Sequence, residues 1–183
     1  MDILSASVAA TMEIHIAHAA LADLAVDAIV LPCHSVGTLS NAAREALAGR
    51  GADGFEEALK AKAPLAIGAA ILADASAVEA GSAILVPISK DSDAPIATEL
   101  LRRGVKAALI AAKLKGYRTL ALPSMITADS TITIAEAARA VTQEIHAHEA
   151  PFPESIYMAA PDEQLMRIFE DAVAHARRAS RSL

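Results

Sequence analysis

Apolar and polar positions divide the chain into short runs typical of strands and longer stretches with helical spacing. Residues 12–19 alternate isoleucine with other side chains, which predicts a strand. Residues 27–32 form a continuous apolar run, which is typical of a strand covered on both faces. Four further strands are expected, at residues 67–74, 81–88, 118–125 and 155–160.

Helical spacing and helix-ending residues place five helices between and after these strands. Ser40 or Asn41 is suited to cap the first helix, and Gly116 ends the third. Thr133 and Glu136 form a capping box for the fourth. The expected helices cover residues 41–51, 52–64, 96–115, 134–149 and 162–178.

The order of these elements predicts an α/β fold formed by a single domain, residues 1–183. In the last third of the chain helices alternate with strands, which requires right-handed crossovers and a largely parallel sheet. Strands 67–74 and 81–88 lie so close in sequence that we expect them to be neighbours in the sheet. The prediction is a three-layer α/β/α arrangement with a mixed, mostly parallel sheet. Its first one or two strands are the candidates for an antiparallel position.

Composition and charge disfavour nucleic acid as a partner. Hydrophobic residues make up 54% of the 183 residues, many of them alanine, whereas aromatic residues are only 3%, so ring-lined pockets are not expected. The formal net charge of −6 is unlike the basic surface of a nucleic-acid-binding protein. The two basic clusters have the helical spacing of solvated faces; they are Arg102, Arg103 and Lys106, and Arg177, Arg178 and Arg181.

The single cysteine, Cys33, excludes an internal disulfide and suits a reducing compartment. The amino-terminal residues lack the cationic start of a signal peptide, and no apolar run is long enough to cross a membrane. We therefore expect a cytoplasmic protein without a membrane partner and without a cofactor. A metal site is not expected either, because the two histidine pairs lack acidic company; they are His15 with His18 and His146 with His148.

Three short segments resemble the macro domain family, the ADP-ribose-binding module. They are VDAIV at residues 26–30, GAAILADASAVEAGSAILVPI at residues 68–88 and ALPSMITADSTITIAEAA at residues 121–138. In the third segment Leu122–Pro123, Thr127 and Ala137–Ala138 fall at the family's positions. The resemblance extends over roughly residues 12–178 and implies a macro-domain-like α/β/α fold with a nucleotide-binding cleft.

Several positions that hold the nucleotide in the family carry other residues here. The aspartate that accepts a hydrogen bond from adenine corresponds to Ala20, and Asp23 lies three residues away. The second asparagine of the family's Asn-Ala-Ala-Asn segment, which helps to place the distal ribose in hydrolytic members, corresponds to His34. Only Gly37 remains of the Gly-rich turn that follows, and no aromatic ring follows the last strand. The glycines of the phosphate loop correspond to Ile126, Ala128 and Thr131.

These replacements change what the loop at residues 124–131 offers a ligand. Glycines allow backbone N–H groups to approach a diphosphate with positive φ, which the β-branched Ile126 adopts poorly. Asp129 places a negative charge where a diphosphate would lie. The resemblance therefore implies a divergent macro-like protein with a degenerate pocket, from which the typical ADP-ribose-gripping residues are lost.

The remaining candidates for ligand contact lie near the carboxyl ends of the expected strands and in the loop before the fourth helix. Hydroxyl groups dominate this loop, and they suit a sugar or a nucleoside without its phosphates. Helix capping by Ser130, Thr131 or Thr133 explains part of the same pattern. The predicted ligand-binding residues are Asp23, Cys33, His34, Ser35, Gly37, Ser124, Thr127, Ala128, Asp129, Ser130 and Thr131.

Catalytic chemistry is offered only by Cys33, His34 and Asp129. In this interpretation Cys33 is a thiolate nucleophile, His34 assists it, and Asp129 orients the histidine. Adjacent residues at a strand end point to opposite sides, which makes a contact between Cys33 and His34 awkward. A buried small side chain and a loop histidine explain the same two residues without catalysis.

Three functions remain open. The favoured hypothesis is a binding module for an ADP-ribose-related or other nucleotide-like or small polar ligand, rather than an enzyme. The second is a hydrolase of ADP-ribosyl or O-acetyl-ADP-ribose bonds. The third is a non-catalytic structural protein whose alanine-rich helix at residues 96–115 pairs with a second copy in a homo-oligomer.

Overall fold

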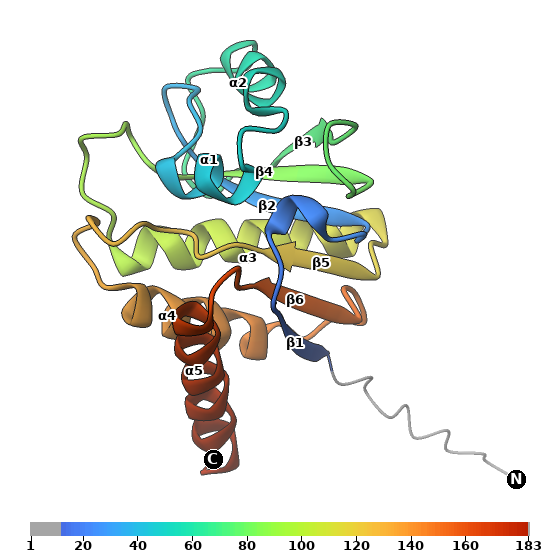
Figure 1. Cartoon of the computed structure of the whole chain (residues 1–183), viewed down its shortest axis with the longest axis vertical. Coiled ribbons are helices and arrows are strands. Elements are labelled where there is room, and N and C mark those ends of the chain that lie inside the picture. Colours follow the sequence, from blue (N-terminus) through green and yellow to red (C-terminus); the bar gives the residue numbers. More distant parts are fainter. Residues whose placement is uncertain (1–11, 183) are drawn as a thin grey trace, which may run out of the picture.

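Six strands form one sheet in the order β1-β6-β5-β2-β4-β3, and five α-helices and one short 3-10 helix surround it (Figure 1). The computed structural model describes residues 12–182. The strands are β1 (Glu13–Ala17), β2 (Ala28–His34), β3 (Ile71–Asp74), β4 (Ser82–Ser89), β5 (Thr119–Leu122) and β6 (Ser155–Ala159). The helices are η1 (Leu21–Asp23), α1 (Asn41–Leu47), α2 (Ala52–Lys60), α3 (Thr98–Lys115), α4 (Ile134–Ala147) and α5 (Glu163–Arg181).

All neighbouring strands are parallel except β3 and β4, which run antiparallel. The mixed, mostly parallel sheet is confirmed, as is the pairing of β3 with β4. The expectation that an antiparallel strand comes first was wrong, because β1 pairs in parallel with β6. The physical reason is the length of the connections. Residues 75–81 are a short reversal that brings β4 back beside β3, whereas β1 meets a partner from the far end of the chain.

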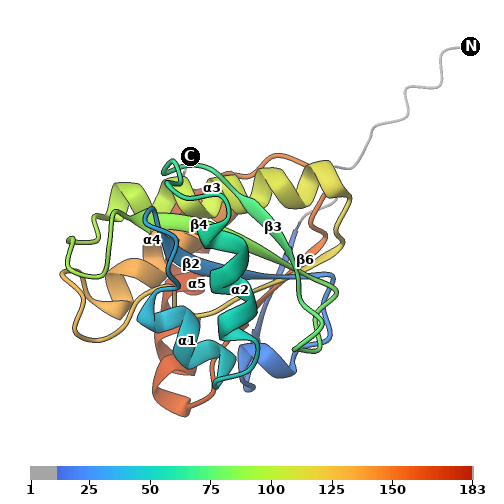
Figure 2. The ribbon, with the colours of Figure 1, turned by 90° about the horizontal axis from the view of Figure 1, so that it is seen from above.

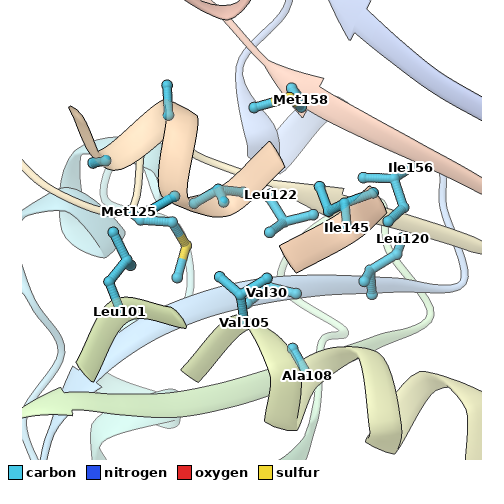
Figure 3. Packing of buried hydrophobic residues seen from close by; sticks show 14 of the residues in the cluster. Val30, Leu101, Val105, Ala108, Leu120, Leu122, Met125, Ile145, Ile156 and Met158 are labelled. Carbon is cyan, nitrogen blue, oxygen red and sulfur yellow. The ribbon is translucent and has the colours of Figure 1, made fainter. Parts of the chain in front are cut away.

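Two hydrophobic clusters cover the two faces of the sheet and confirm the three-layer prediction. On one face, alternate residues of the strands pack against α3, α4 and α5. Figure 3 shows Val30 of β2 beside Val105 of α3, and Leu120 and Met158 belong to the same cluster. On the other face the remaining alternate residues pack against α1 and α2. Figure 2 shows α3 and α1 on opposite sides of β2.

The helix ends agree with the sequence signals in most places. The Ser40 hydroxyl accepts a hydrogen bond from the Ala43 amide, and Gly116 ends α3 with φ 67°. The capping box at the start of α4 is formed in both directions. Ala48, rather than a glycine, takes the left-handed conformation after α1, with φ 50°. The 3-10 helix η1 was not predicted. Across residues 12–182, no helix combines the length and the apolar character needed to span a bilayer.

Leu109 and Leu114 of α3 provide a test of this packing. Leu109 is 1% exposed in the core, whereas Leu114 is 78% exposed on the outer side of the same helix. We expect Leu109→Ala to lower the free energy of unfolding by about 2–5 kcal/mol, because it removes buried methyl groups and leaves a cavity. Leu114→Ala is the matched control and should change it by less than about 0.5 kcal/mol. Urea unfolding followed by circular dichroism measures both, and equal losses would contradict the layer assignment.

Candidate functional site

The carboxyl ends of the five parallel strands lie at one edge of the sheet, and the connecting segments gather there. The chain leaves β2 toward β4 on one side and returns through α3 to β5 on the other side of β2. Such a change of direction creates a crevice at the carboxyl edge, where open α/β sheets bind their ligands. Strand pairing shows how it opens. β2 pairs with β4 over its whole length but with β5 only at Ala28 and Ile29.

A clamp at the opposite edge holds β2 and β5 together where their pairing begins. The Asp27 carboxylate accepts hydrogen bonds from the amides of Arg118 and Thr119, at 2.7 and 3.1 Å. The Asp27 amide donates to the Thr119 hydroxyl at 2.9 Å. The two strands are therefore fixed at their amino ends and separate toward their carboxyl ends.

The larger cavity in this crevice has a volume of about 760 Å³. Its walls come from the segment after β1, from one face of α1, from the β5–α4 loop, and from the segment after β6 together with the first turns of α5. The principal lining residues are Ala20, Leu21, Ala42, Glu45, Ala46, Ser124, Ile126, Thr127, Ala128, Asp129, Ala159, Asp162 and Leu165.

A smaller pocket of about 200 Å³ continues the crevice over β2 and β4. His34, the start of α1, the β4–α3 loop and the β5–α4 loop line it. The two spaces share a boundary formed by Ala42, Ile126, Thr127 and Asp129. The structure thus brings the two predicted segments, around His34 and around Thr127, to one crevice.

Negative charge dominates the lining of both spaces. Glu45, Asp129 and Asp162 line the larger cavity, and Asp93 joins Asp129 in the smaller one. Within residues 12–182, neither lining contains a lysine or an arginine. A ligand carrying several negative charges would meet carboxylates here without a compensating cation.

Three helices border the crevice, and in each of them a capping side chain already accepts a hydrogen bond from one amino-terminal amide. The side chains of Ser40, Thr133 and Asp162 accept hydrogen bonds from the third amide of α1, α4 and α5, respectively. Helix amino termini bind anions through such amides. Internal capping therefore reduces what these helices offer a phosphate.

The loop after β5 is likewise held by its own hydrogen bonds. The Ile126 amide donates to the Ser124 carbonyl, and the Ser124 hydroxyl donates to the Ile126 carbonyl at 2.8 Å. The Thr127 hydroxyl donates to the Asp129 carboxylate, and this bond holds the pKa of Asp129 below its usual value. The loop's positive φ, 34°, falls at Met125. Ile126, as expected for a β-branched residue, does not adopt it.

Thr131 connects two loops at the mouth of the smaller pocket. Its hydroxyl donates to the Ile96 carbonyl at 2.9 Å and accepts from the Ile96 amide at 3.2 Å. The β4–α3 loop is thereby fixed beside the β5–α4 loop, and both contribute to the lining.

Cys33 and His34 lie in different surroundings. Cys33 is fully buried in the core below α1, and burial raises the pKa of its thiol to about 12. His34 lines the smaller pocket, and its Nδ1 lies 2.6 Å from the Ser89 hydroxyl oxygen. Burial lowers the pKa of His34, while Asp91 opposes this effect. The structure thus separates the thiol from the pocket that His34 and Asp129 share.

Three other predicted ligand contacts lie outside the two cavities. Asp23 is exposed, and its carboxylate accepts a hydrogen bond from Arg50 at 2.6 Å. The Ser35 backbone joins two loops, accepting from the Leu65 amide and donating to the Ser89 carbonyl. Gly37, with φ 94°, lies against Lys60 and Ala63, so it serves the turn after β2.

Sequence reasoning missed the contribution of α1 and of the β4–α3 loop. Ala42, Glu45 and Ala46 share one helical face that forms a wall of the larger cavity. Residues spaced three and four apart share a face, but the spacing alone gives no sign of which partner that face meets. The hydroxyl of Ser89, which contacts His34, gave no sequence signal at all.

One histidine of each of the two predicted pairs has a local partner. His15 stacks on Tyr157 with ring centroids 5.0 Å apart, and its Nε2 lies 3.2 Å from the Glu13 carboxylate. His148 Nε2 lies 2.9 Å from the Phe152 carbonyl oxygen. Residues 12–182 contain no group of three or more histidine, cysteine, aspartate or glutamate side chains placed to hold a metal ion.

Comparisons with known proteins relate this arrangement to one family. The family model of the Macro domain matches residues 30–141. A protein of Aquifex aeolicus (strain VF5), itself named as uncharacterized, is 26% identical over 159 residues, which cover 87% of this chain and 96% of that protein.

Solved structures share the fold at low sequence identity. The Oceanobacillus iheyensis macrodomain with ADP has a TM-score of 0.73 at 15% identity, covering 90% of this chain and 91% of that one. The macrodomain of Thermus aquaticus DarG has a TM-score of 0.63 at 16% identity, covering 81% and 98%. The Trypanosoma brucei macrodomain in complex with ADP has a TM-score of 0.71 at 16% identity, covering 91% and 72%.

The placement of Cys33 predicts an inert thiol. With a pKa of about 12, only about one thiol in ten thousand is ionised at pH 8, and the sulfur is not accessible. We expect no labelling by a disulfide reagent in the native protein and complete labelling in denaturant, measured by absorbance. Val36→Cys in a Cys33→Ala background is the control, because Val36 is 50% exposed nearby and its thiol should react quickly. Fast labelling of native Cys33 would contradict the assignment.

Proposed function

Since the chain belongs to the Macro domain family, we propose that it is a binding module that holds a small polar ligand related to ADP-ribose in the crevice beside β2 and β5. The observation that carries the proposal is the cavity of about 760 Å³ at the carboxyl edge of the sheet. This volume lies within the range of small-molecule sites, and the position is the one that this topology favours. The macrodomains with ADP provide a precedent for nucleotide ligands on the same fold.

The chemistry of the lining favours the uncharged parts of such a ligand. Apolar walls from Leu21, Ala46 and Leu165 suit a base or another flat ring, and Ser124 and Thr127 supply hydroxyls. The carboxylates of Glu45 and Asp129 oppose a diphosphate. A nucleoside or sugar therefore fits this lining better than ADP-ribose itself.

The two alternatives have less support. A hydrolase that used Cys33 as its nucleophile has no support, because Cys33 is a buried thiol whose raised pKa keeps it protonated. Self-association would use the outer face of α3, where Ile110 and Leu114 are exposed one turn apart. Two apolar side chains form a small patch compared with a stable interface.

A comparison of ligands tests the proposal. We expect adenosine to raise the unfolding temperature, and to bind more tightly than ADP or ADP-ribose in calorimetry at low salt, because the carboxylates repel the phosphates. Ala46→Phe should abolish binding by filling the larger cavity, whereas Ala179→Phe, at an exposed site on α5, should leave it unchanged. If none of these ligands binds at high concentration, the proposed function is wrong.

The carboxylates themselves can be tested by neutral replacements. Glu45→Gln combined with Asp129→Asn should strengthen ADP-ribose binding roughly two- to fivefold per charge removed at low salt, and the gain should shrink as salt is added. Glu57→Gln combined with Glu170→Gln removes the same charge outside both cavities and is the control. An equal gain in the two double variants would show that net charge, and not the lining, limits binding.

A further inference from the structure

We propose that Glu56 of α2 is a positioning residue for the crevice, because its carboxylate holds α1 where that helix forms a wall of both cavities. Glu56 itself is not among the described residues that line either cavity. The inference rests on the proposed function, since it names a residue that controls from outside how well the same crevice holds its ligand.

Helix α1 contributes to both spaces. Asn41 and Ala42 line the smaller pocket, and Ala42, Glu45 and Ala46 line the larger cavity. With seven residues, the helix has about two turns and few main-chain hydrogen bonds of its own. Its position therefore depends on contacts with its surroundings, and a displacement of α1 would change the shape of both cavities.

Apolar packing anchors mainly the carboxyl end of α1. The buried side chains of the helix are those of Ala42, Ala43 and Leu47, and only the last of these is large. Burial contributes free energy in proportion to the apolar area removed from water, so the two alanines contribute little at the amino end. That end borders the smaller pocket, and its position depends on polar contacts.

Glu56 supplies these contacts from the neighbouring helix. Its Oε1 accepts a hydrogen bond from the Leu39 amide at 3.0 Å, one residue before the capping residue Ser40. The same oxygen forms an ion pair with the guanidinium of Arg44, about one turn into α1. Lys60 Nζ lies 4.0 Å from the other carboxylate oxygen. One carboxylate thus holds the start of α1 through both its backbone and a side chain.

The surroundings of Glu56 distinguish this contact from an ordinary surface ion pair. The Glu56 side chain is only 12% exposed, whereas that of Glu154, which pairs with Arg118 at the opposite edge of the sheet, is 46% exposed. Water screens an exposed pair and leaves it little net effect. Removing the Glu56 carboxylate costs more, because it also leaves the Leu39 amide without its acceptor.

Hydrogen exchange tests the positioning without any ligand. We expect Glu56→Ala to speed exchange of the amides of residues 39 and 43–47 roughly three- to tenfold, with α3 and α4 unchanged, because only the hold on α1 is lost. Glu56→Gln keeps a side-chain oxygen that accepts from the Leu39 amide, so its increase should be smaller. Glu154→Ala removes the same charge and the partner of another arginine, and it should leave α1 unchanged. Unchanged exchange in α1 of Glu56→Ala, or faster exchange spread equally over all helices, would overturn the proposal.

Calorimetry with adenosine tests the consequence for the crevice. We expect Glu56→Ala to weaken adenosine binding roughly three- to tenfold and Glu56→Gln to weaken it less. Arg44→Met removes the ion pair from the side of α1 and keeps an apolar stem, so it should also weaken binding and replaces Glu56→Ala if that variant does not fold. Glu154→Ala is again the control and should bind like the unaltered protein. A merely structural role would lower the unfolding temperature without changing the affinity of the folded protein.

The outcomes separate this inference from the proposed function. If adenosine binds but neither Glu56→Ala nor Arg44→Met changes its affinity, the positioning role is wrong and the binding module stands. If adenosine, ADP and ADP-ribose all fail to bind the unaltered protein, the proposed function is wrong, and so is the role of Glu56 at a ligand site. Weaker binding together with faster exchange confined to α1 and Leu39 supports both.

Discussion

The crevice depends on the way β2 and β5 are joined at one end only. Asp27 fixes the amino ends through two backbone amides of the neighbouring strand, and the ladder between the strands stops after Ile29. Beyond that point β2 remains paired with β4 alone. The parallel direction of the strands then determines which segments reach the opening, because every loop that follows a parallel strand emerges at the same edge. The cavity is thus a result of topology before any lining side chain is considered.

The polar side chains around the crevice form hydrogen bonds mainly with other parts of the protein. The capping residues Ser40, Thr133 and Asp162 occupy helix amides, and the β5–α4 loop bonds to itself and to Ile96. Each of these bonds stabilises the walls, and each removes a donor that an anion would need. Rigidity of the walls and affinity for phosphate therefore oppose one another here. A ligand in this crevice would have to gain its binding free energy from burial of flat or apolar surface and from a few hydrogen bonds.

The sequence predicted the helices and strands better than it predicted the contacts between them. Helix α3 and the capping box of Thr133 and Glu136 follow from local signals, namely helical spacing, a terminal glycine and a paired side chain. The antiparallel partner was misplaced because strand direction is decided by the length of the connection and by the layers on each face, not by the strand's own residues. Among the residues that line the crevice, His34 and Thr127 were predicted by aligning the sequence with the family's motifs. Glu45 was missed because only the docking of α1 turns it toward the cavity.

Cys33 and His34 are adjacent in sequence, but β2 places their side chains in different surroundings. Alternation along β2 directs Cys33 into the layer below α1, and it thereby removes the thiol from solvent and from reaction. The register of β2 against β4 shifts between these same two residues. The shift pairs His34 with Ser89, and this serine then orients the ring through the Asp91 carbonyl. The irregularity in the ladder thereby brings Ser89 within reach of His34 at the edge of the smaller pocket. A one-residue change in pairing thus places polar side chains where the end of this core strand meets the crevice.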